Sequence, residues 1–395
     1  MANLERLDHG PGLDKASGLA CKRRTRDLSY NKAGYDFSCW ETTMTKKQIF
    51  HRSFALLAGL ALCALILGAA ATKSARVARI IQTNSAGDNV HIIDPVTNKV
   101  VGVIEGIEVN HGVAVAPDGT RIYISDEAQS TLDVVDSKTL KVTNRIPLSG
   151  HPNNIAVAPD GRRVYVGIIQ APGGVDVIDT GSLQDLKTLP TKGSIHNPYV
   201  TPDGKYVVAG SIAGKTVNVI DTQTDQTAWT LQMDLGVRPM AFYKNPDGST
   251  KWIFVQMSGF NGFAVVDFAT HQEIKRIQNP PLAPGKSIVT AGADPSHGMA
   301  VTRDGKTLVV CSRINNELYS YSLPDLKVIG DAYLGGKGAA WVTLTPDGKT
   351  AYVANAVTND VSAVDVKSMK EIARIPVGFV PKRNTTGMLP AQSAD

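Results

Sequence analysis

Cysteine is scarce in this sequence, and most of it is concentrated at one end. Cys21, Cys39 and Cys63 precede residue 72, and Cys311 stands alone in the apolar run 308–311. One cysteine cannot form a disulfide framework, and a cysteine in an apolar strand is typically a small core residue. The C-x-x-C-H motif is also absent, which excludes covalent attachment of a c-type heme.

A strong charge of one sign is missing as well. Of the 41 Lys/Arg and 36 Asp/Glu, residues 1–71 hold ten and six, which leaves 31 and 30 in residues 72–395. Electrostatic attraction of nucleic acid depends on a positive surplus. Aromatic residues make up only 6% of the chain, so platforms for base stacking are few. Nucleic acid is therefore not an expected partner.

The familiar catalytic motifs are absent too. The sequence has no G-x-S-x-G nucleophile elbow and no H-E-x-x-H zinc motif. This absence favours a binding platform over an enzyme. The sequence leaves open an enzymatic alternative, a lactonase-like protein or a metal-dependent oxidoreductase.

Residues 44–71 have the pattern of a secretory signal peptide. Lys46, Lys47 and Arg52 precede the apolar run 53–68, and Ala69–Ala71 provides an A-x-A cleavage site. Cleavage near Ala71 would place the mature protein in the periplasm or outside the cell, with no membrane span left. An uncleaved anchor is the alternative. Residues 1–43 precede the natural start Met44, and we interpret them as a mis-assigned gene start or a disordered extension.

A tandem repeat dominates the rest of the chain. An Asp that ends an apolar run is followed three residues later by Thr or Ser, with Ser322…Asp325 as a degenerate copy. The first members are Asp94, Asp136, Asp179, Asp221, Asp267, Ser322 and Asp365. Their spacings of 42, 43, 42, 46, 55 and 43 residues indicate one structural unit per repeat.

A second motif has the same period. Pro-Asp-Gly or a variant of it recurs at Asp118, Asp160, Asp203, Asp247, Asp304 and Asp347. Pro presets φ and Gly supplies a positive φ, so this motif predicts a tight turn. In the first motif, Asp and Thr side chains bond to nearby backbone and also predict turns. Neither set of aspartates indicates catalysis.

Four strands fit between the turns of each unit. In the first complete unit they are 112–116, 121–125, 131–135 and 141–146, all alternating and rich in β-branched residues. Six complete units begin near residues 111, 151, 196, 238, 297 and 338. Residues 79–104 supply three more strands, and residues 379–390 supply a fourth. The sequence therefore predicts an all-β, seven-bladed propeller of four-stranded blades, one domain over residues 72–395, closed by strands from both termini.

The repeat resembles a known family. Segments 351–355 (AYVAN), 361–365 (VSAVD) and 111–119 (HGVAVAPDG) are similar to the YVTN-family propeller repeat, including the YncE-like exported propellers. The resemblance covers about residues 79–390. It implies the fold firmly and the function weakly, because the wider fold includes binding platforms, lactonases and copper-bearing propellers.

Candidate site residues gather where inner strands begin. His111, His196 and His297 each stand six residues before the Pro, or the Arg303, of the turn motif. Asn153 takes that place in another unit, with His151 two residues earlier. Propeller symmetry directs all of these toward the mouth of the central channel.

The chemistry at this mouth has two interpretations. His111, His196 and His297 could ligate Cu, Zn or Fe, or the imidazoles could simply cap strand ends along a wet channel. Arg238, Lys337 and Arg383 also lie near starts of inner strands and would suit a small anionic ligand. The partner is thus an unidentified protein or a small anion, and we expect a monomer.

One loop exceeds the repeat length. The stretch from Asp267 to Asp304 is 37 residues, against 24 from Asp136 to Asp160, and the excess falls around residues 279–296. Long loops on a rigid scaffold often carry function. We expect this one to wall a site above the channel mouth.

Overall fold

The computed structural model describes residues 75–288 and 294–391. The predicted extension and signal peptide lie outside these residues. Everything described belongs to the second of two units of the chain, Lys73–Asp395. Within the described residues, no helix is long and apolar enough to cross a membrane.

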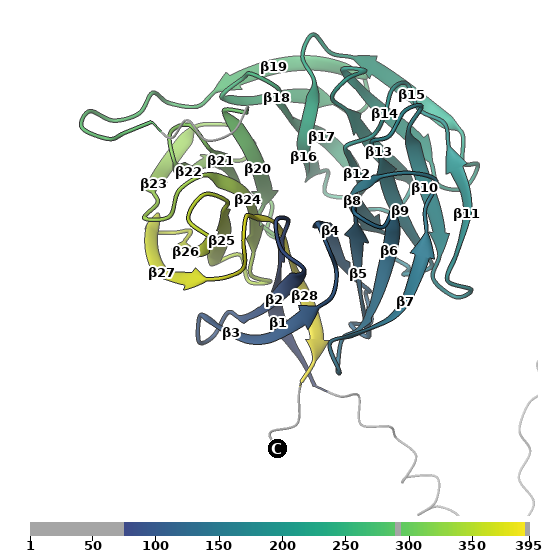
Figure 1. The fold of residues 1–395 in the computed structure, drawn as a ribbon. Coiled ribbons are helices and arrows are strands. Elements are labelled where there is room, and N and C mark those ends of the chain that lie inside the picture. The colour runs from purple at the N-terminus through teal and green to yellow at the C-terminus, as the bar shows by residue number, and fades with distance from the viewer. Residues whose placement is uncertain (1–74, 289–293, 392–395) are drawn as a thin grey trace, which may run out of the picture. The chain divides into compact units, whose positions relative to one another are not determined.

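Within residues 75–288 and 294–391, twenty-eight strands form seven antiparallel sheets of four strands each, which confirms the predicted propeller (Figure 1). We number the sheets as blades 1 to 7, and the strands of the first three, from the inner strand outward, are as follows. Blade 1 is β4 (Asn110–Val115), β5 (Arg121–Asp126), β6 (Thr131–Asp136) and β7 (Lys141–Pro147). Blade 2 is β8 (Pro152–Val157), β9 (Arg163–Ile168), β10 (Gly174–Asp179) and β11 (Gln184–Leu189). Blade 3 is β12 (Asn197–Val200), β13 (Tyr206–Ser211), β14 (Thr216–Asp221) and β15 (Thr227–Gln232).

The remaining blades follow the same plan. Blade 4 is β16 (Val237–Lys244), β17 (Thr250–Met257), β18 (Gly262–Asp267) and β19 (Gln272–Gln278). Blade 5 is β20 (Ser296–Val301), β21 (Thr307–Ser312), β22 (Glu317–Ser322) and β23 (Val328–Tyr333). Blade 6 is β24 (Ala339–Leu344), β25 (Thr350–Asn355), β26 (Asp360–Asp365) and β27 (Lys370–Pro376). Blade 7 is β28 (Pro381–Pro390), β1 (Arg76–Asn84), β2 (Asn89–Asp94) and β3 (Lys99–Glu105).

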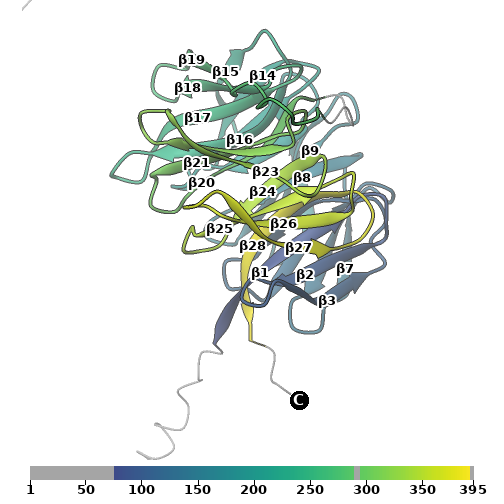
Figure 2. The ribbon, with the colours of Figure 1, turned by 90° about the vertical axis from the view of Figure 1, so that its left-hand side faces the viewer.

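Blade 7 joins the two ends of the described chain. The C-terminal strand β28 pairs with β1 along its whole length, from Arg76↔Pro390 to Asn84↔Pro381. Figures 1 and 2 both show the yellow β28 beside the purple β1. Strand β28 also contacts the inner strands β24 and β4 of the two neighbouring blades. The ring is therefore closed, and β1 is not left with an unpaired edge.

The turns form by the local chemistry that the repeat predicts. Asp136 Oδ1 accepts from the Thr139 amide at 2.7 Å and from the Thr139 hydroxyl at 2.9 Å. In the Pro-Asp-Gly turn, Gly119 has φ +78° and its amide donates to the Ala116 carbonyl at 2.8 Å. Such short-range bonds form with little loop-closure entropy, so each blade is specified by its own sequence.

The hydrophobic core lies between blades rather than within them. Seven clusters of buried side chains each combine residues from two neighbouring blades. Between blades 4 and 5, for example, the rings of Phe254, Phe263 and Tyr321 meet edge-on. The outermost strands, by contrast, are mostly exposed. Each blade therefore buries its faces only when its neighbours are present.

Blade 2 contains two neighbouring carboxyl groups, Asp176 and Asp185. Buried Asp176 accepts from the Ser149 hydroxyl and the Thr188 hydroxyl, both at 2.7 Å. Asp185 lies beside it on β11, and burial together with the Asp176 charge raises the pKa of Asp185 to about 6. Below that pH Asp185 is protonated and can donate to Asp176.

We expect this pair to make stability depend on pH. The folded pKa lies above the unfolded value, so the stabilisation is complete below about pH 4 and is lost as the pH rises through about 6. Because Asp185 is partly exposed, the change should be limited to about 1–2 kcal/mol. Urea unfolding between pH 4 and pH 7.5 measures it. Asp185→Asn should flatten the curve over this range, and an unchanged slope would contradict the assignment.

Candidate functional site at the channel mouth

The residues predicted at the mouth all lie where an inner strand begins or in the loop before it. They are His111 in β4, His151 just before β8, Asn153 in β8, His196 just before β12, Arg238 in β16, His297 in β20, Lys337 before β24 and Arg383 in β28. The inner strands contact one another around the ring. Their first residues therefore converge on the axis of the propeller.

Arg383 lies at the centre of this group. Its side chain comes from the closing strand β28 and is only 1% exposed. Nη2 donates to Asn153 Oδ1, and the guanidinium stacks on the Trp341 ring at 4.6 Å from its centroid. Nε and Nη1 have no hydrogen-bond partner among the described residues. A buried cation with unused donors is costly unless a ligand satisfies it.

The three histidines surround this cation as neutral bases. Each Nδ1 already has a partner: Glu127 Oε2 at 2.8 Å for His111, the Ala340 carbonyl at 2.7 Å for His297, and Asn197 Oδ1 for His196. Burial, followed by the charge of Arg383, holds the pKa of all three well below the usual value. At neutral pH they therefore add no positive charge to the channel.

The imidazoles are not grouped as ligands for one metal ion. Among residues 75–288 and 294–391, no three His, Cys, Asp or Glu side chains lie close enough together to hold a metal. The positive charge of Arg383 acts on all three imidazoles. This charge would repel a metal cation placed between them. The described residues at the mouth thus form a polar lining with a cationic centre.

Further cations extend the positive region around Arg383. Lys382 lies next to it, and burial and the Arg383 charge lower the pKa of Lys382 to about 8. Arg238 pairs with Asp294 at 2.7 Å and donates to the Ser258 hydroxyl at 2.8 Å. The Nε of Arg313 is buried without a partner among the described residues. Four cations thus face two carboxylates, Asp294 and the Glu127 that binds His111.

Two predicted residues lie outside this buried group. The side chains of His151 and Lys337 are exposed, although His151 Nδ1 lies 3.2 Å from the Glu127 carbonyl. They belong to the rim of the mouth rather than to its centre.

The two described ends of the long loop 279–295 contact different parts of the propeller. Lys286 Nζ binds Glu317 Oε1 at 2.7 Å and lies over the Tyr333 ring, so this part packs on the outer strands β22 and β23 of blade 5. At the other end of the loop, Asp294 binds Arg238 at the mouth. Residues 289–293 lie outside the described residues. The described part thus walls the mouth only at Asp294.

Several residues of the site escape sequence reasoning. Glu127 and Arg313 share one repeat position, the first residue after the second strand of a blade, but the residue type at this position differs between blades. Trp341 is expected in the core by its place in an inner strand, but it is partly exposed and packs on Arg383 and, at 5.7 Å between ring centroids, on His297. An odd aromatic at an inner-strand position was the only available signal.

Comparison with known proteins now gives the family. Residues 78–378 match the family model described as the cytochrome D1 heme domain. The chain belongs to that family. Its name differs from the YVTN family that the repeat resembles, and the part confirmed is the seven-bladed propeller. The match ends before β28, so it does not include Arg383. No curated protein matches the sequence.

Solved structures share the fold at low sequence identity. Hydrazine synthase of Kuenenia stuttgartiensis is 22% identical, with a TM-score of 0.61 over 72% of this chain and 92% of that one. The dihydro-heme d1 dehydrogenase NirN in complex with DHE is 17% identical, with a TM-score of 0.58 over 78% of this chain and 74% of that one. The periplasmic gluconolactonase PpgL of Pseudomonas aeruginosa is 16% identical, with a TM-score of 0.63 over 79% of this chain and 100% of that one. These likenesses concern the fold alone.

The described channel does not fit the heme that the family name implies. A heme iron takes an axial imidazole that opens onto a space for the macrocycle. His111 and His297 are 4% and 3% exposed, and His111 Nε2 lies 3.5 Å from Asn153 Nδ2. His196 lies beside the buried Arg383 charge. In this arrangement His111 and His297 have no open face for a macrocycle, and a cation lies beside His196.

Proposed function

We propose that the protein binds a small anionic ligand, such as a carboxylate, at the mouth of its central channel. The observation that carries the proposal is Arg383, a guanidinium 1% exposed whose Nε and Nη1 lack partners among the described residues. A guanidinium presents several N–H donors in one plane and suits a carboxylate that accepts two of them. The stacking on Trp341 holds that plane in place.

The surroundings support an anion over a cation or a neutral ligand. Lys382, Arg238 and Arg313 add positive potential, and the three imidazoles are neutral. In such a buried setting each charge interaction is stronger than in water. An exported propeller that carries a small anion, without changing it, agrees with the absence of catalytic motifs.

The proposal is tested by calorimetric titration with acetate, succinate, citrate and inorganic phosphate. At least one should bind with micromolar to millimolar affinity, and Arg383→Met should abolish binding. Because the pKa of Lys382 is about 8, affinity should fall as the pH rises through that value. Lys337→Met is the matched control, because it removes one exposed positive charge at the same mouth. Equal losses in the two variants, or no binding by wild type, would refute the proposal.

A second candidate is an enzyme, and one observation favours it. Glu127 Oε2 lies 2.8 Å from His111 Nδ1, which orients the imidazole with Nε2 as its unprotonated nitrogen, 3.5 Å from Asn153 Nδ2. A carboxylate–imidazole pair beside an anion anchor could remove a proton from a bound hydroxy acid or activate water at a lactone. Formation of product during the same titrations, followed by NMR, would favour this candidate over simple binding.

A further inference from the structure

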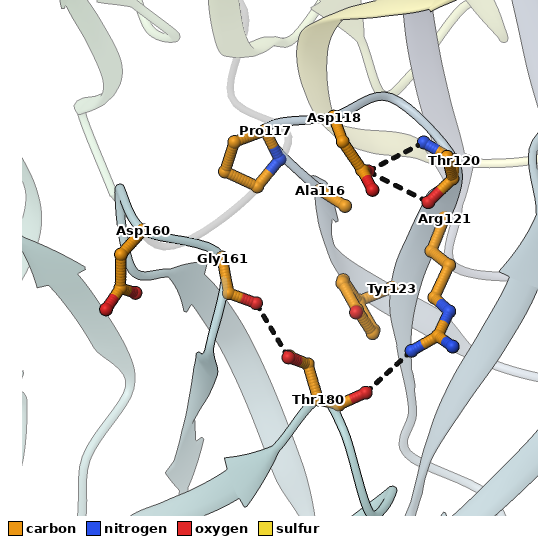
Figure 3. A pocket seen from close by; sticks show the side chains of 9 residues that line it. All are labelled: Ala116, Pro117, Asp118, Thr120, Arg121, Tyr123, Asp160, Gly161 and Thr180. Carbon is orange, nitrogen blue, oxygen red and sulfur yellow. Dashed lines mark hydrogen bonds between the residues drawn. The ribbon is translucent and has the colours of Figure 1, made fainter. Parts of the chain in front are cut away.

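Two neighbouring grooves open at the end of the propeller opposite to the channel mouth. Groove 1 is a cavity of about 350 Å³ between blades 1 and 2, and its lining includes Asp118, Arg121, Tyr123, Asp160, Gly161 and Thr180 (Figure 3). Groove 2, of about 520 Å³, lies between blades 2 and 3, and its lining includes Asp160, Arg162, Arg163, Tyr165 and Asp203. Both volumes are in the range of small-ligand sites.

The two grooves are copies of one another, one repeat apart. Each has a Pro-Asp-Gly turn on either side, an arginine three residues after its first aspartate, and a tyrosine two residues further on. Asp160 lines both grooves. In Figure 3 its carboxylate is turned away from Tyr123, whereas Asp118 lies on the same side as Arg121. The repeat has thus produced two adjacent cavities with the same chemistry.

Each tyrosine hydroxyl keeps an unused donor. The Tyr123 phenol lies near Arg121, and the Tyr165 phenol lies near Arg163. A guanidinium only donates hydrogen bonds, so neither arginine can accept the phenol proton. No hydrogen bond from either hydroxyl to an acceptor occurs among the described residues. Figure 3 shows the Tyr123 ring between Arg121 and the Gly161–Thr180 side of groove 1.

In blade 6 the equivalent tyrosine hydroxyl has a hydrogen-bond acceptor within the protein. This tyrosine, Tyr352, donates to Asn98 Oδ1 at 2.6 Å and lies 3.3 Å from the Pro95 carbonyl in the turn of the next blade. Opposite Tyr123, the residue equivalent to Asn98 is Leu183, which cannot accept a hydrogen bond through its side chain. Opposite Tyr165, the equivalent residue is Asp225, which already binds Arg163 and Lys187. Two of the repeats therefore leave a polar cavity where blade 6 makes an internal contact.

The chemistry of the grooves matches vicinal hydroxyl groups. Arginine donates, aspartate accepts, and the tyrosine hydroxyl does both, as each sugar hydroxyl also does. Asp118 and Asp160 beside Arg121 disfavour an anion in groove 1, and Arg121 disfavours a cation. In groove 2 two aspartates face two arginines. A neutral ligand with many donors and acceptors fits both grooves better than a charged one.

We propose that this face binds a neutral oligosaccharide, with one sugar unit in groove 1 and a nearby unit in groove 2. Two cavities with similar linings, one blade apart, suit a polymer of repeating units, because simultaneous occupation raises affinity above that of either site. The site is independent of the anion site at the channel mouth. It would let the protein attach to a glycan surface while the opposite face stays accessible.

A glycan array of neutral hexose and N-acetylhexosamine oligomers tests the proposal, followed by calorimetry with the best hexasaccharide and its monomer. The hexasaccharide should bind at least about tenfold more tightly than the monomer. The double variant Tyr123→Phe/Tyr165→Phe removes only two oxygens and should weaken binding about tenfold or more. Tyr352→Phe is the matched control and should bind as wild type does.

Three results would overturn the proposal. The array could show no binding of any neutral glycan, or the double variant could bind as tightly as wild type. Binding of acidic glycans or peptides only, at the same grooves, would assign a different ligand class. Arg383→Met should leave glycan binding unchanged, so failure of this proposal and failure of the anion proposal are distinguishable.

Discussion

Replacing Arg383 by Met should make the ligand-free protein more stable. The guanidinium is buried, keeps its charge because its pKa is lowered only to about 10, and has two nitrogens without partners. Met has a similar length and can keep the contact with Trp341. When an uncompensated buried charge is replaced by a well-packed apolar side chain, stability typically rises, here by about 1–4 kcal/mol. Urea unfolding in a buffer free of small anions measures the difference.

The comparison needs an arginine in the opposite situation. Arg145 Nε binds Asp133 Oδ2 at 3.1 Å, and Asp133 is fully buried. Arg145→Met should therefore destabilise the fold, because it leaves a buried carboxylate without its partner. If Arg383→Met also lowered stability, the contacts of the guanidinium with Asn153 and Trp341 would outweigh its burial. Such a result would contradict the proposal that the unpaired Arg383 guanidinium is compensated by a bound anion.

A chain that ends at Gly378 should lose the native fold altogether. The truncation removes β28, exposes the backbone edge of β1, and uncovers Gln82 and Thr83, which are fully buried. It also opens the contacts of β28 with β4 and β24. The loss should exceed the total stability of a typical domain, about 5–15 kcal/mol. We expect insoluble or non-cooperatively unfolding protein, measured by the soluble yield and by thermal unfolding.

A chain ending at Ala391 is the control for this truncation. It keeps all of β28 and should unfold at the same temperature as the full chain. If the Gly378 chain were soluble and unfolded cooperatively near the wild-type temperature, six blades with an open edge would be self-sufficient. Closure by β28 would then not be what holds the ring together.

The blades could be predicted from sequence because their signals are local. The Asp136–Thr139 pair and the Pro-Asp-Gly turn each form by contacts between residues no more than four apart in sequence. Each repeat therefore contains the residues that specify its own hairpins. Strand ends in blade 1 agree with the expectation to within two residues. The convergence of His111, His196 and His297 on the axis followed from the period alone.

The electrostatics of the site could not be predicted in the same way. The place of Arg383 at the mouth was predicted, but its burial among the imidazoles follows from the pairing of β28 with β1, about 300 residues away in sequence. Glu127 and Arg313 lie in loops whose sequences differ from blade to blade. A metal site seemed open because three imidazoles shared a repeat position. The cation that stands among them belongs to a different part of the chain.

The closing strand also has a temporal meaning. Strand β28 is the last part of the fold to be synthesised, and it carries both Lys382 and Arg383. Six blades precede the strand that carries the residue on which the proposed anion binding depends. A product clipped before β28 would therefore lack the proposed site even if its other strands were retained.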